Sequence, residues 1–152
     1  MVFFIDNKNE KEEIAKEILN SLKDWFAVQE NTNKLINSSK EMLFWANIES
    51  GQTRGFIALN KTSPYTVEVY VMGVLKEFHR KKIGHDLFKA CYDYAKEKGY
   101  LYMQVKTVKE GLYEDYDRTN KFYKSLGFKE FECFPLLWDE LNPCQIYIMS
   151  II

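Results

Sequence analysis

The stretch TVEVYVMGVLKEFHRKKIGHDLFKACYDYAKEKG, from Thr66 to Gly99, decides the fold of this chain. Its first part alternates valine with other residues from Val67 onward, which predicts a β-strand over 67–74. A short basic loop follows, and the residues after it place apolar side chains at helical spacing. Those apolar positions are Ile83, Leu87, Phe88, Cys91, Tyr92 and Ala95. The segment therefore predicts a strand, a basic loop and an amphipathic helix, in that order.

The loop between this strand and this helix is a candidate anion site. The first backbone N–H groups of a helix have no intrahelical partner, and the helix dipole favours negative charge beside them. Arg80, Lys81 and Lys82 add positive side chains at the same place. We expect a ligand that carries phosphate groups here; the alternative is a basic turn that faces only solvent. The loop holds a single glycine, Gly84, and matches neither GxxxxGK[ST] nor GxGxxG.

Two motifs in the chain resemble those of the GCN5-related N-acetyltransferases (GNATs). The loop HRKKIG resembles the family pattern Gln/Arg-x-x-Gly-x-Gly/Ala, with His79 at the first position, Lys82 at the first glycine and Gly84 at the second. The segment NKFYKSLGF, residues 120–128, is similar to the short tyrosine-containing helix and Leu-Gly-Phe turn that close the family's motifs. The resemblance covers residues 67–128 by motif and the remainder by the order of elements.

The resemblance implies one N-acetyltransferase domain over residues 1–152 with an α/β fold. Its sheet would be mixed and mostly antiparallel, with helices on both faces and a central parallel pair of strands, 67–74 and 100–108, that splay apart. Apolar patterns predict the other elements: helices over 9–26 and 31–39, strands over 42–48, 54–59, 129–134 and 145–151, and a short helix around Tyr123. Pro135 and Pro143 are expected to bound an irregular excursion between the last two strands.

The resemblance implies acetyl-CoA as co-substrate, bound at the splayed strands and the loop. Backbone groups of Met72, Gly73 and Val74 would pair with the pantetheine amides as an added strand would, and the glycine would allow a close approach. The pyrophosphate would meet the helix start, provided that Lys82 keeps a negative φ and turns its ammonium to the 3′-phosphate. Asn120 either contacts pantetheine or caps its helix. The full expected set is Met72, Gly73, Val74, His79, Arg80, Lys81, Lys82, Ile83, Gly84, His85 and Asn120.

The resemblance also implies the groups that help an amine attack a thioester. Tyr123 matches the family's tyrosine beside the sulfur. The pKa of a free phenol, about 10, is close enough to that of a thiol, about 8.5, for proton donation; the alternative is a core aromatic. Glu68 stands where histone acetyltransferases of the family have a glutamate base, and alternation places it on the same face as Val74, in an apolar neighbourhood. In the alternative, Glu68 only faces solvent and Tyr70 or a water chain is the base.

Two acidic and aromatic clusters suggest the acceptor. The first includes Tyr113 and Asp115, and the second includes Trp138 and Asp139. Acidic and aromatic groups attract an ammonium through charge and cation–π contact. We therefore expect a small cationic amine, such as a polyamine, an amino sugar or a lysine-like group. The alternative is that these side chains only keep two loops soluble.

Composition argues against several other classes of protein. The 152 residues carry a net charge of −1 with both signs interspersed, which gives no general footprint for nucleic acid. No window reaches the roughly 18 apolar residues of a membrane span, and residues 1–5 are too short and lack the basic residues of a signal peptide. Three cysteines, an odd number, predict reduced thiols in a cytoplasmic protein. His79 and His85 lack partners at the spacing of metal ligands, so no metal is expected.

Two other functions are compatible with the sequence. A non-catalytic acyl-CoA-binding or sensor domain would keep the fold and bind the cofactor without turnover. An interaction module would pair its closing strand, residues 145–152, with a second subunit in a homodimer, and this arrangement can coexist with catalysis.

Overall fold

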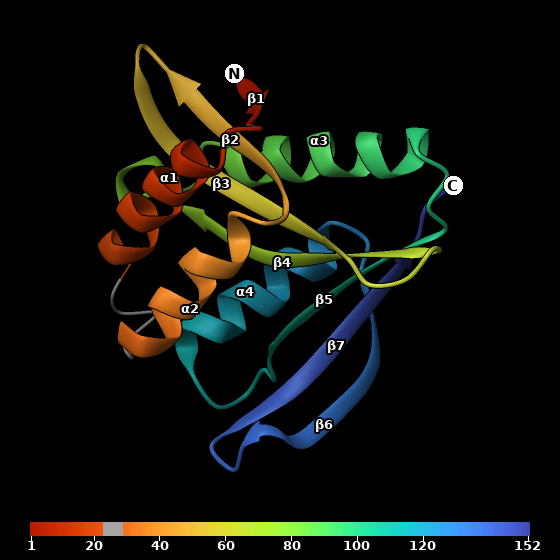
Figure 1. Ribbon diagram of the computed structural model, residues 1–152. Helices are drawn as coiled ribbons and strands as arrows, with labels where there is room; N and C mark the ends of the chain where they lie inside the picture. The colour runs from red at the N-terminus through yellow and green to blue at the C-terminus, as the bar shows by residue number, and fades with distance from the viewer. Residues whose placement is uncertain (23–28) are drawn as a thin grey trace.

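The computed structural model describes residues 1–22 and 29–152, which form one seven-stranded sheet in the order β1-β2-β3-β4-β5-β7-β6 (Figure 1). The strands are β1 (Val2–Phe4), β2 (Leu43–Glu49), β3 (Gln52–Lys61), β4 (Thr66–Val74), β5 (Tyr102–Val108), β6 (Lys129–Asp139) and β7 (Asn142–Ser150). The helices are α1 (Lys8–Ser21), α2 (Gln29–Ser39), α3 (Ile83–Glu97) and α4 (Glu114–Ser125), with a 3₁₀ turn at Lys76–Phe78. Neighbouring strands are antiparallel except β4 and β5, which are parallel. The predicted mixed sheet with one parallel pair is confirmed.

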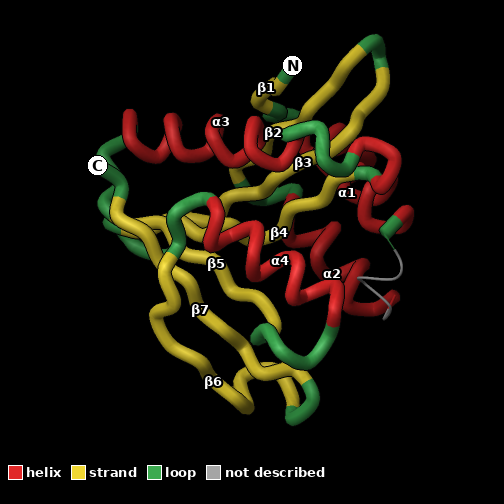
Figure 2. Tube along the Cα trace, turned by 180° about the vertical axis from the view of Figure 1, so that it is seen from behind, coloured by secondary structure: helices red, strands yellow, loops and turns green. Residues whose placement is uncertain are grey.

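Helices cover both faces of the sheet, as predicted. α1 and α2 pack on β3 and β4 from the side nearer the viewer in Figure 1, and Figure 2 shows α3 and α4 from the opposite side. α3 buries Leu87 and Cys91 in a core with Val69 of β4. α1 buries Ile18 in a second core with Phe56 of β3. Full burial of an apolar side chain of this size stabilises the fold by about 1.5–3 kcal/mol, so these two cores hold the helices on the sheet.

β4 carries one extra residue at Tyr70. Its neighbour β3 pairs Leu59 with Val69 and Ala58 with Val71, which leaves Tyr70 without a partner in that pairing. An extra residue of this kind shifts every later side chain to the opposite face of the strand. Val69 accordingly lies in the α3 core and Val71 in the α1 core, although the two residues would share a face in a regular strand.

The bulge overturns one prediction about the site. Val74 follows the bulge and packs against the α3 core. Glu68 precedes it, between Val67 and Val69 of the α3 core, so its side chain lies on the other face of the sheet. The prediction that Glu68 and Val74 share a face is therefore wrong.

The last two strands also differ from the prediction. β6 continues to Asp139 and β7 begins at Asn142, so the expected excursion between Pro135 and Pro143 is a tight hairpin. The pairing of the two strands is irregular between Phe134 and Asp139. Because a proline cannot donate to the strand ladder, the irregular part of β6 is where Pro135 is tolerated.

The start of the chain adds an element that the sequence did not predict. Val2–Phe4 forms an edge strand beside β2, and three residues are too few for a readable pattern. The described part of α1 ends at Ser21. Its predicted continuation through Trp25 to Phe26 lies outside the described residues.

Candidate functional site

The parallel strands β4 and β5 separate halfway along their length. They pair from Thr66 opposite Tyr102 to Val69 opposite Val105. Beyond that point β4 continues along β3, and β5 continues along β7. β5 is therefore paired with only the first half of β4. Beyond that point the two strands diverge, and a gap opens beside the second half of β4. This is the splay that the family resemblance implies.

Backbone groups of β4 face this gap. The N–H of Leu75 donates to the carbonyl of Arg54 at 2.9 Å, so Leu75 points toward β3. Backbone groups alternate between the two sides of a strand, and those of Met72 and Val74 therefore point away from β3. They are placed to pair with an extended amide chain in the gap.

Gly73 has a packing role that the sequence analysis did not predict. Its backbone groups point toward β3, by the same alternation. A Cβ at this position would lie 2.9 Å from Cγ2 of Ile18 and 3.3 Å from Cδ1 of Leu22. Glycine is therefore required for the close packing of α1 on β4, and its expected approach to the pantetheine stays a prediction.

The basic loop contains two residues in the left-handed backbone region. Arg80 has φ 65° and Lys82 has φ 62°, so the expectation of a negative φ at Lys82 is wrong. The left-handed conformation costs a residue with a side chain about 1–2 kcal/mol. His79 fixes the loop to the end of β4, because its Nε2 lies 2.7 Å from the carbonyl oxygen of Val74 and donates to it. Lys81 places its Nζ 5.7 Å from the ring centroid of Phe78.

α3 begins directly after the loop with unpaired donors. Its first helical hydrogen bond runs from the N–H of Asp86 to the carbonyl of Lys82, so the N–H groups of Ile83, Gly84 and His85 lack intrahelical acceptors. Arg80, Lys81, Lys82 and His85 are exposed around this helix start. Backbone donors, helix dipole and exposed cations thus meet at the end of β4, and together they can bind a polyanion such as a pyrophosphate.

Gly84 allows α3 to start this close to β4 and α4. A Cβ there would lie 3.1 Å from Cε of Met72 and 3.1 Å from Cζ of Phe122. A larger residue would push the helix start away from the gap. The second glycine of the family pattern therefore has a packing reason in this chain.

The strained backbone at Lys82 gives a testable prediction. We expect Lys82→Gly to raise the free energy of unfolding by up to about 1 kcal/mol, because glycine adopts positive φ without a steric cost. That corresponds to a rise in Tm of about 2–4 °C for a domain of this size. Lys81→Gly is the matched control: Lys81 is not among the residues with positive φ, so this change should lower Tm. A lower Tm for both variants would contradict the prediction.

Tyr123 lies in the core between α4 and the sheet. Its side chain is 8% exposed and packs edge-on against Phe128, with ring centroids 5.8 Å apart. Burial holds the pKa of its phenol well above the usual range. The expectation that this pKa lies close to that of a thiol is therefore wrong. The phenol stays neutral and can donate a hydrogen bond to a developing anion, but it gives up its proton less readily than a solvated tyrosine.

Asn120 is a structural link in the core. It is fully buried within α4, whose N-cap is Tyr113, so the N-cap interpretation is wrong. Its Nδ2 donates to the carbonyls of Val108 at 2.8 Å and Tyr116 at 2.6 Å. Its Oδ1 accepts from the hydroxyl of Tyr147 at 2.6 Å. The amide thus joins α4 to β5 and β7, and we assign it no contact with pantetheine.

Glu68 belongs to a polar group that the sequence analysis missed. Its side chain is almost fully buried, and its Oε2 lies 3.1 Å from Nζ of Lys106. The same oxygen accepts from Nε2 of Gln104 at 3.2 Å. The expected apolar neighbourhood is therefore wrong. A signal was present in β5, because Gln104 and Lys106 are polar residues two apart in the strand and so share a face.

The residues predicted to bind the acceptor already have protein partners. The hydroxyl of Tyr113 donates to the carbonyl of Leu141 at 3.0 Å, so the two clusters do meet where α4 begins beside the β6–β7 turn. Asp115, however, is paired with Arg118. Asp139 accepts from the N–H of Leu141 at 2.9 Å and from the amide of Asn142, and Trp138 lies exposed on β6. These carboxylates stabilise a helix and a turn.

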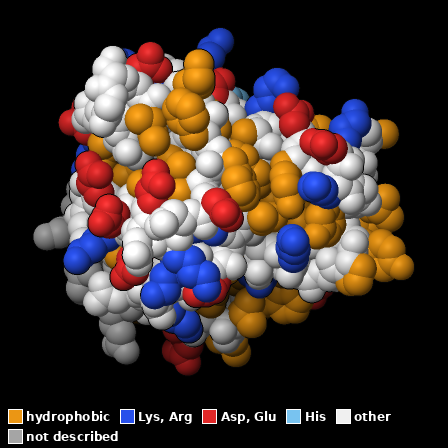
Figure 3. All heavy atoms as spheres, turned by 45° about the horizontal axis from the view of Figure 1, so that its top comes forward, with side chains coloured by type: hydrophobic (Ala, Val, Ile, Leu, Met, Phe, Trp, Pro, Cys, Tyr) orange, Lys and Arg blue, Asp and Glu red, His pale blue; other side chains and the backbone are white. Residues whose placement is uncertain are grey.

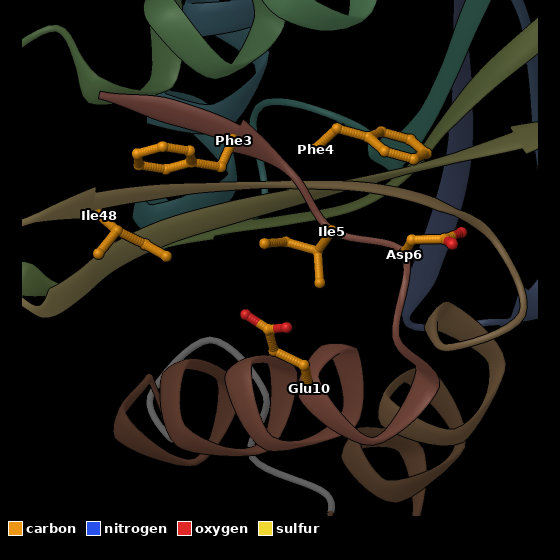
Figure 4. Close-up of a pocket in the computed structure, with 6 residues that line it drawn as sticks. All are labelled: Phe3, Phe4, Ile5, Asp6, Glu10 and Ile48. Carbon is orange, nitrogen blue, oxygen red and sulfur yellow. The ribbon is translucent and has the colours of Figure 1, made fainter.

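Other features of the described residues add no second site. A shallow cleft of about 390 Å³ lies between β1, β2 and α1, where Glu10 points toward Ile5 (Figure 4). It is separated from the gap by β2 and β3.

Acidic and basic side chains are interspersed on the face in Figure 3. Across residues 1–22 and 29–152, no helix is long and apolar enough to cross a membrane, and no three potential metal ligands gather.

Comparison with known proteins agrees with this geometry. A family model described as the acetyltransferase (GNAT) domain matches residues 39–130. No curated protein matches the chain. Solved structures with the same fold include these three.

One is an aminoglycoside 6′-N-acetyltransferase in complex with coenzyme A, with 14% identity over 100% of this chain and 97% of that chain and a TM-score of 0.74. A second is the aminoglycoside 6′-N-acetyltransferase of Enterococcus faecium, with 16% identity, the same coverages and a TM-score of 0.73. A third is the ribosomal-protein-S18-alanine N-acetyltransferase of Escherichia coli, with 15% identity over 99% of this chain and 94% of that chain and a TM-score of 0.71. At these identities the likeness shows the fold.

Proposed function

Because the chain belongs to the acetyltransferase (GNAT) family, we propose that it transfers an acetyl group from acetyl-CoA to a primary amine. One observation carries the proposal: the pairing of β4 with β5 stops at Val69 and Val105, and the unpaired half of β4 leads directly to the start of α3. A strand edge that can take up amides and a helix start that can take up phosphates are thereby adjacent. Pantetheine and pyrophosphate are adjacent in the same way within coenzyme A.

The cofactor-binding residues follow from that placement. Backbone groups of Met72 bind a pantetheine amide, the N–H of Val74 faces the thioester, and the N–H groups of Ile83, Gly84 and His85 bind the pyrophosphate. Arg80, Lys81 and Lys82 supply positive charge for the phosphates, and His79 holds the loop. Gly73 contributes indirectly, because it allows α1 to pack closely on β4.

The same residues support a direct transfer in a ternary complex. Acetyl-CoA supplies the thioester, and transfer forms the C–N bond and breaks the C–S bond. Glu68, or a water that it orders, takes the proton from the attacking amine. Tyr123 donates a hydrogen bond to the sulfur as negative charge develops there. The N–H of Val74 is the donor for the carbonyl oxygen.

The structurally similar enzymes act on acceptors of different kinds. Two act on aminoglycosides by name, and the third acts on a ribosomal protein. We infer a small cationic amine for this chain, as the sequence predicted. A cytoplasmic location and a homodimer through residues 145–152 stay predictions.

Thermal unfolding with nucleotide ligands tests the proposal. At 100 times Kd, acetyl-CoA should stabilise the protein by about 2.7 kcal/mol, a rise in Tm of roughly 5–11 °C. ATP and NADH, at equal concentrations, control for binding of phosphates alone. A rise with acetyl-CoA only supports the cofactor and justifies measuring CoA release with a panel of amines. No rise, or an equal rise with ATP, would overturn the proposal.

A second candidate is a domain that binds acyl-CoA without turnover. The observation in its favour is the ion pair of Glu68 with Lys106, which occupies one oxygen of the proposed base. This candidate predicts the same rise in Tm with acetyl-CoA but no release of CoA with any amine.

A further inference from the structure

One face of β5, β7 and β6, which we call the open face, carries exposed side chains at Lys106 and Glu132. The described helices α1 and α2 pack on β3 and β4, and none of the described helices is drawn in front of β7 and β6 in Figure 1. On the opposite face, Met103, Val105 and Tyr147 are buried under α3 and α4. The open face must therefore carry the side chains that alternate with those three.

The pairing register shows which residues share this open face. In one row Glu68 of β4 is opposite Gln104, which is opposite Ile148, which is opposite Lys129. In the next row Lys106 is opposite Ile146, which is opposite Glu132. Directly opposite residues in neighbouring strands point to the same side of the sheet. The face thus has a carboxylate at each end, Glu68 and Glu132.

The surface between the two carboxylates is apolar at its centre. Ile146 and Ile148 are half-buried, whereas Glu132 is exposed at the edge of the sheet. Strands lie about 4.8 Å apart, so the three steps from β4 to β6 separate the two backbones by about 14 Å. Because Glu132 lies one row further along the strands than Glu68, about 7 Å, the two backbones are about 16 Å apart, a distance that two long side chains and an aliphatic diamine can span together. An aliphatic chain can lie across the isoleucines with a polar group at each end.

We propose that this face binds an acceptor with two ammonium groups separated by an aliphatic chain, and that Glu132 binds the ammonium that does not react. The inference rests on the proposed function, because the reacting amine is placed at Glu68 beside the gap. An acceptor with one ammonium group would make no ion pair with Glu132, so Glu132 would not increase its affinity.

The other charges on the face fit this assignment. Lys106 is paired with Glu68 at 3.1 Å, so it offsets that carboxylate and favours the uncharged, reactive form of the amine beside it. Lys129 lies in the row of Ile148, one row away from Glu132. Of Glu68 and Glu132, Glu132 is the one that no described lysine or arginine pairs with, and it selects the distal cation.

Glu130 provides a matched control on the same strand. It is opposite Tyr147, whose ring lies in the α3 core, and its Oε1 lies 3.3 Å from Nζ of Lys124. Glu130 therefore points to the other face. Glu130→Gln removes the same charge from β6 without touching the open face.

The experiment compares 1,8-diaminooctane with octylamine as acceptors for the full chain and for both variants. Glu132→Gln should raise KM for the diamine about 5- to 20-fold, the range between an exposed ion pair and a charged hydrogen bond. It should change KM for octylamine less than twofold, and Glu130→Gln should change neither. Tm values of the variants confirm that both fold.

The outcomes separate this inference from the proposed function. An unchanged KM for the diamine in Glu132→Gln, or equal changes for both amines, overturns the role of Glu132. Turnover of other amines but of neither octyl compound overturns the diamine acceptor and leaves the transferase. No turnover with any amine overturns the proposed function and this inference together.

Discussion

Tyr123→Phe lowers kcat by about 10- to 100-fold and leaves KM for acetyl-CoA within about twofold. The variant keeps the ring, and with it the edge-on contact with Phe128, but it removes the hydroxyl that we propose stabilises the leaving sulfur. Loss of one positioned donor costs about 10²–10³ where the charge is fully developed. The smaller effect expected here reflects a thiolate, which is a stable leaving group. The measurement is steady-state release of CoA with a saturating amine.

The pH dependence of this effect follows from the direction of the pKa shift. Burial raises the pKa of Tyr123, so the phenol keeps its proton at a higher pH than a solvated tyrosine. The ratio of wild-type to variant kcat should therefore be constant from pH 7 to pH 10. A ratio that falls toward one in this range would mean that the hydroxyl ionises and is not buried as the structure shows.

Tyr94→Phe is the control for loss of a tyrosine hydroxyl. Tyr94 lies on α3 and packs edge-on against Trp45 with ring centroids 5.3 Å apart. Its removal should leave kcat unchanged. Equal rates for Tyr123→Phe and wild type would remove Tyr123 from the mechanism and leave membership of the family untouched.

Asn120→Ala lowers the free energy of unfolding by about 2–4 kcal/mol. The change deletes three hydrogen bonds of a fully buried amide and leaves the hydroxyl of Tyr147 and the carbonyl of Val108 without this partner. Each buried polar group that loses its partner costs about 1–3 kcal/mol, and the sum is partly relieved by local relaxation. Urea unfolding at neutral pH measures the difference.

Two further measurements distinguish this structural role from binding of the cofactor. Tyr147→Phe removes one of the three hydrogen bonds and should cost about 1 kcal/mol. Acetyl-CoA should bind the folded Asn120→Ala protein with a Kd within about twofold of wild type. Unchanged stability together with weaker binding would show that the amide turns toward pantetheine.

The pattern of neighbouring residues was sufficient to predict the elements whose contacts lie close together in the sequence. The strand, the basic loop and the helix from Val67 to Glu97 have the predicted order, because strand and helix periodicities are visible within a few residues. Gly84 could be matched to the family pattern from the loop alone. The reason for that glycine, its contact with Phe122, depends on a helix further along the chain.

Predictions failed where a distant segment sets the environment of a side chain. Glu68 seemed to lie in an apolar strand, but Lys106 and Gln104 of the neighbouring strand surround it. Asn120 has the spacing of an N-cap, but α4 begins six residues earlier, at Glu114, with Tyr113 as its N-cap. The residues next to Glu68 and Asn120 do not show either outcome, because the partners of Glu68 come from β5 and the N-cap position of Asn120 depends on where α4 begins.

The sequence by itself determined the family, the mixed sheet and the strand–loop–helix segment that can bind acetyl-CoA. Only the tertiary structure decided that Tyr70 forms a bulge, that Val74 consequently lies on the other face from Glu68, and that Glu68 shares its face with Lys106, Ile146 and Glu132. The physical reason is that periodicity is a property of consecutive residues, whereas strand register is set by the packing of segments far apart in the chain. One extra residue in β4 leaves the local pattern of valines intact and yet reverses the face on which the later side chains lie.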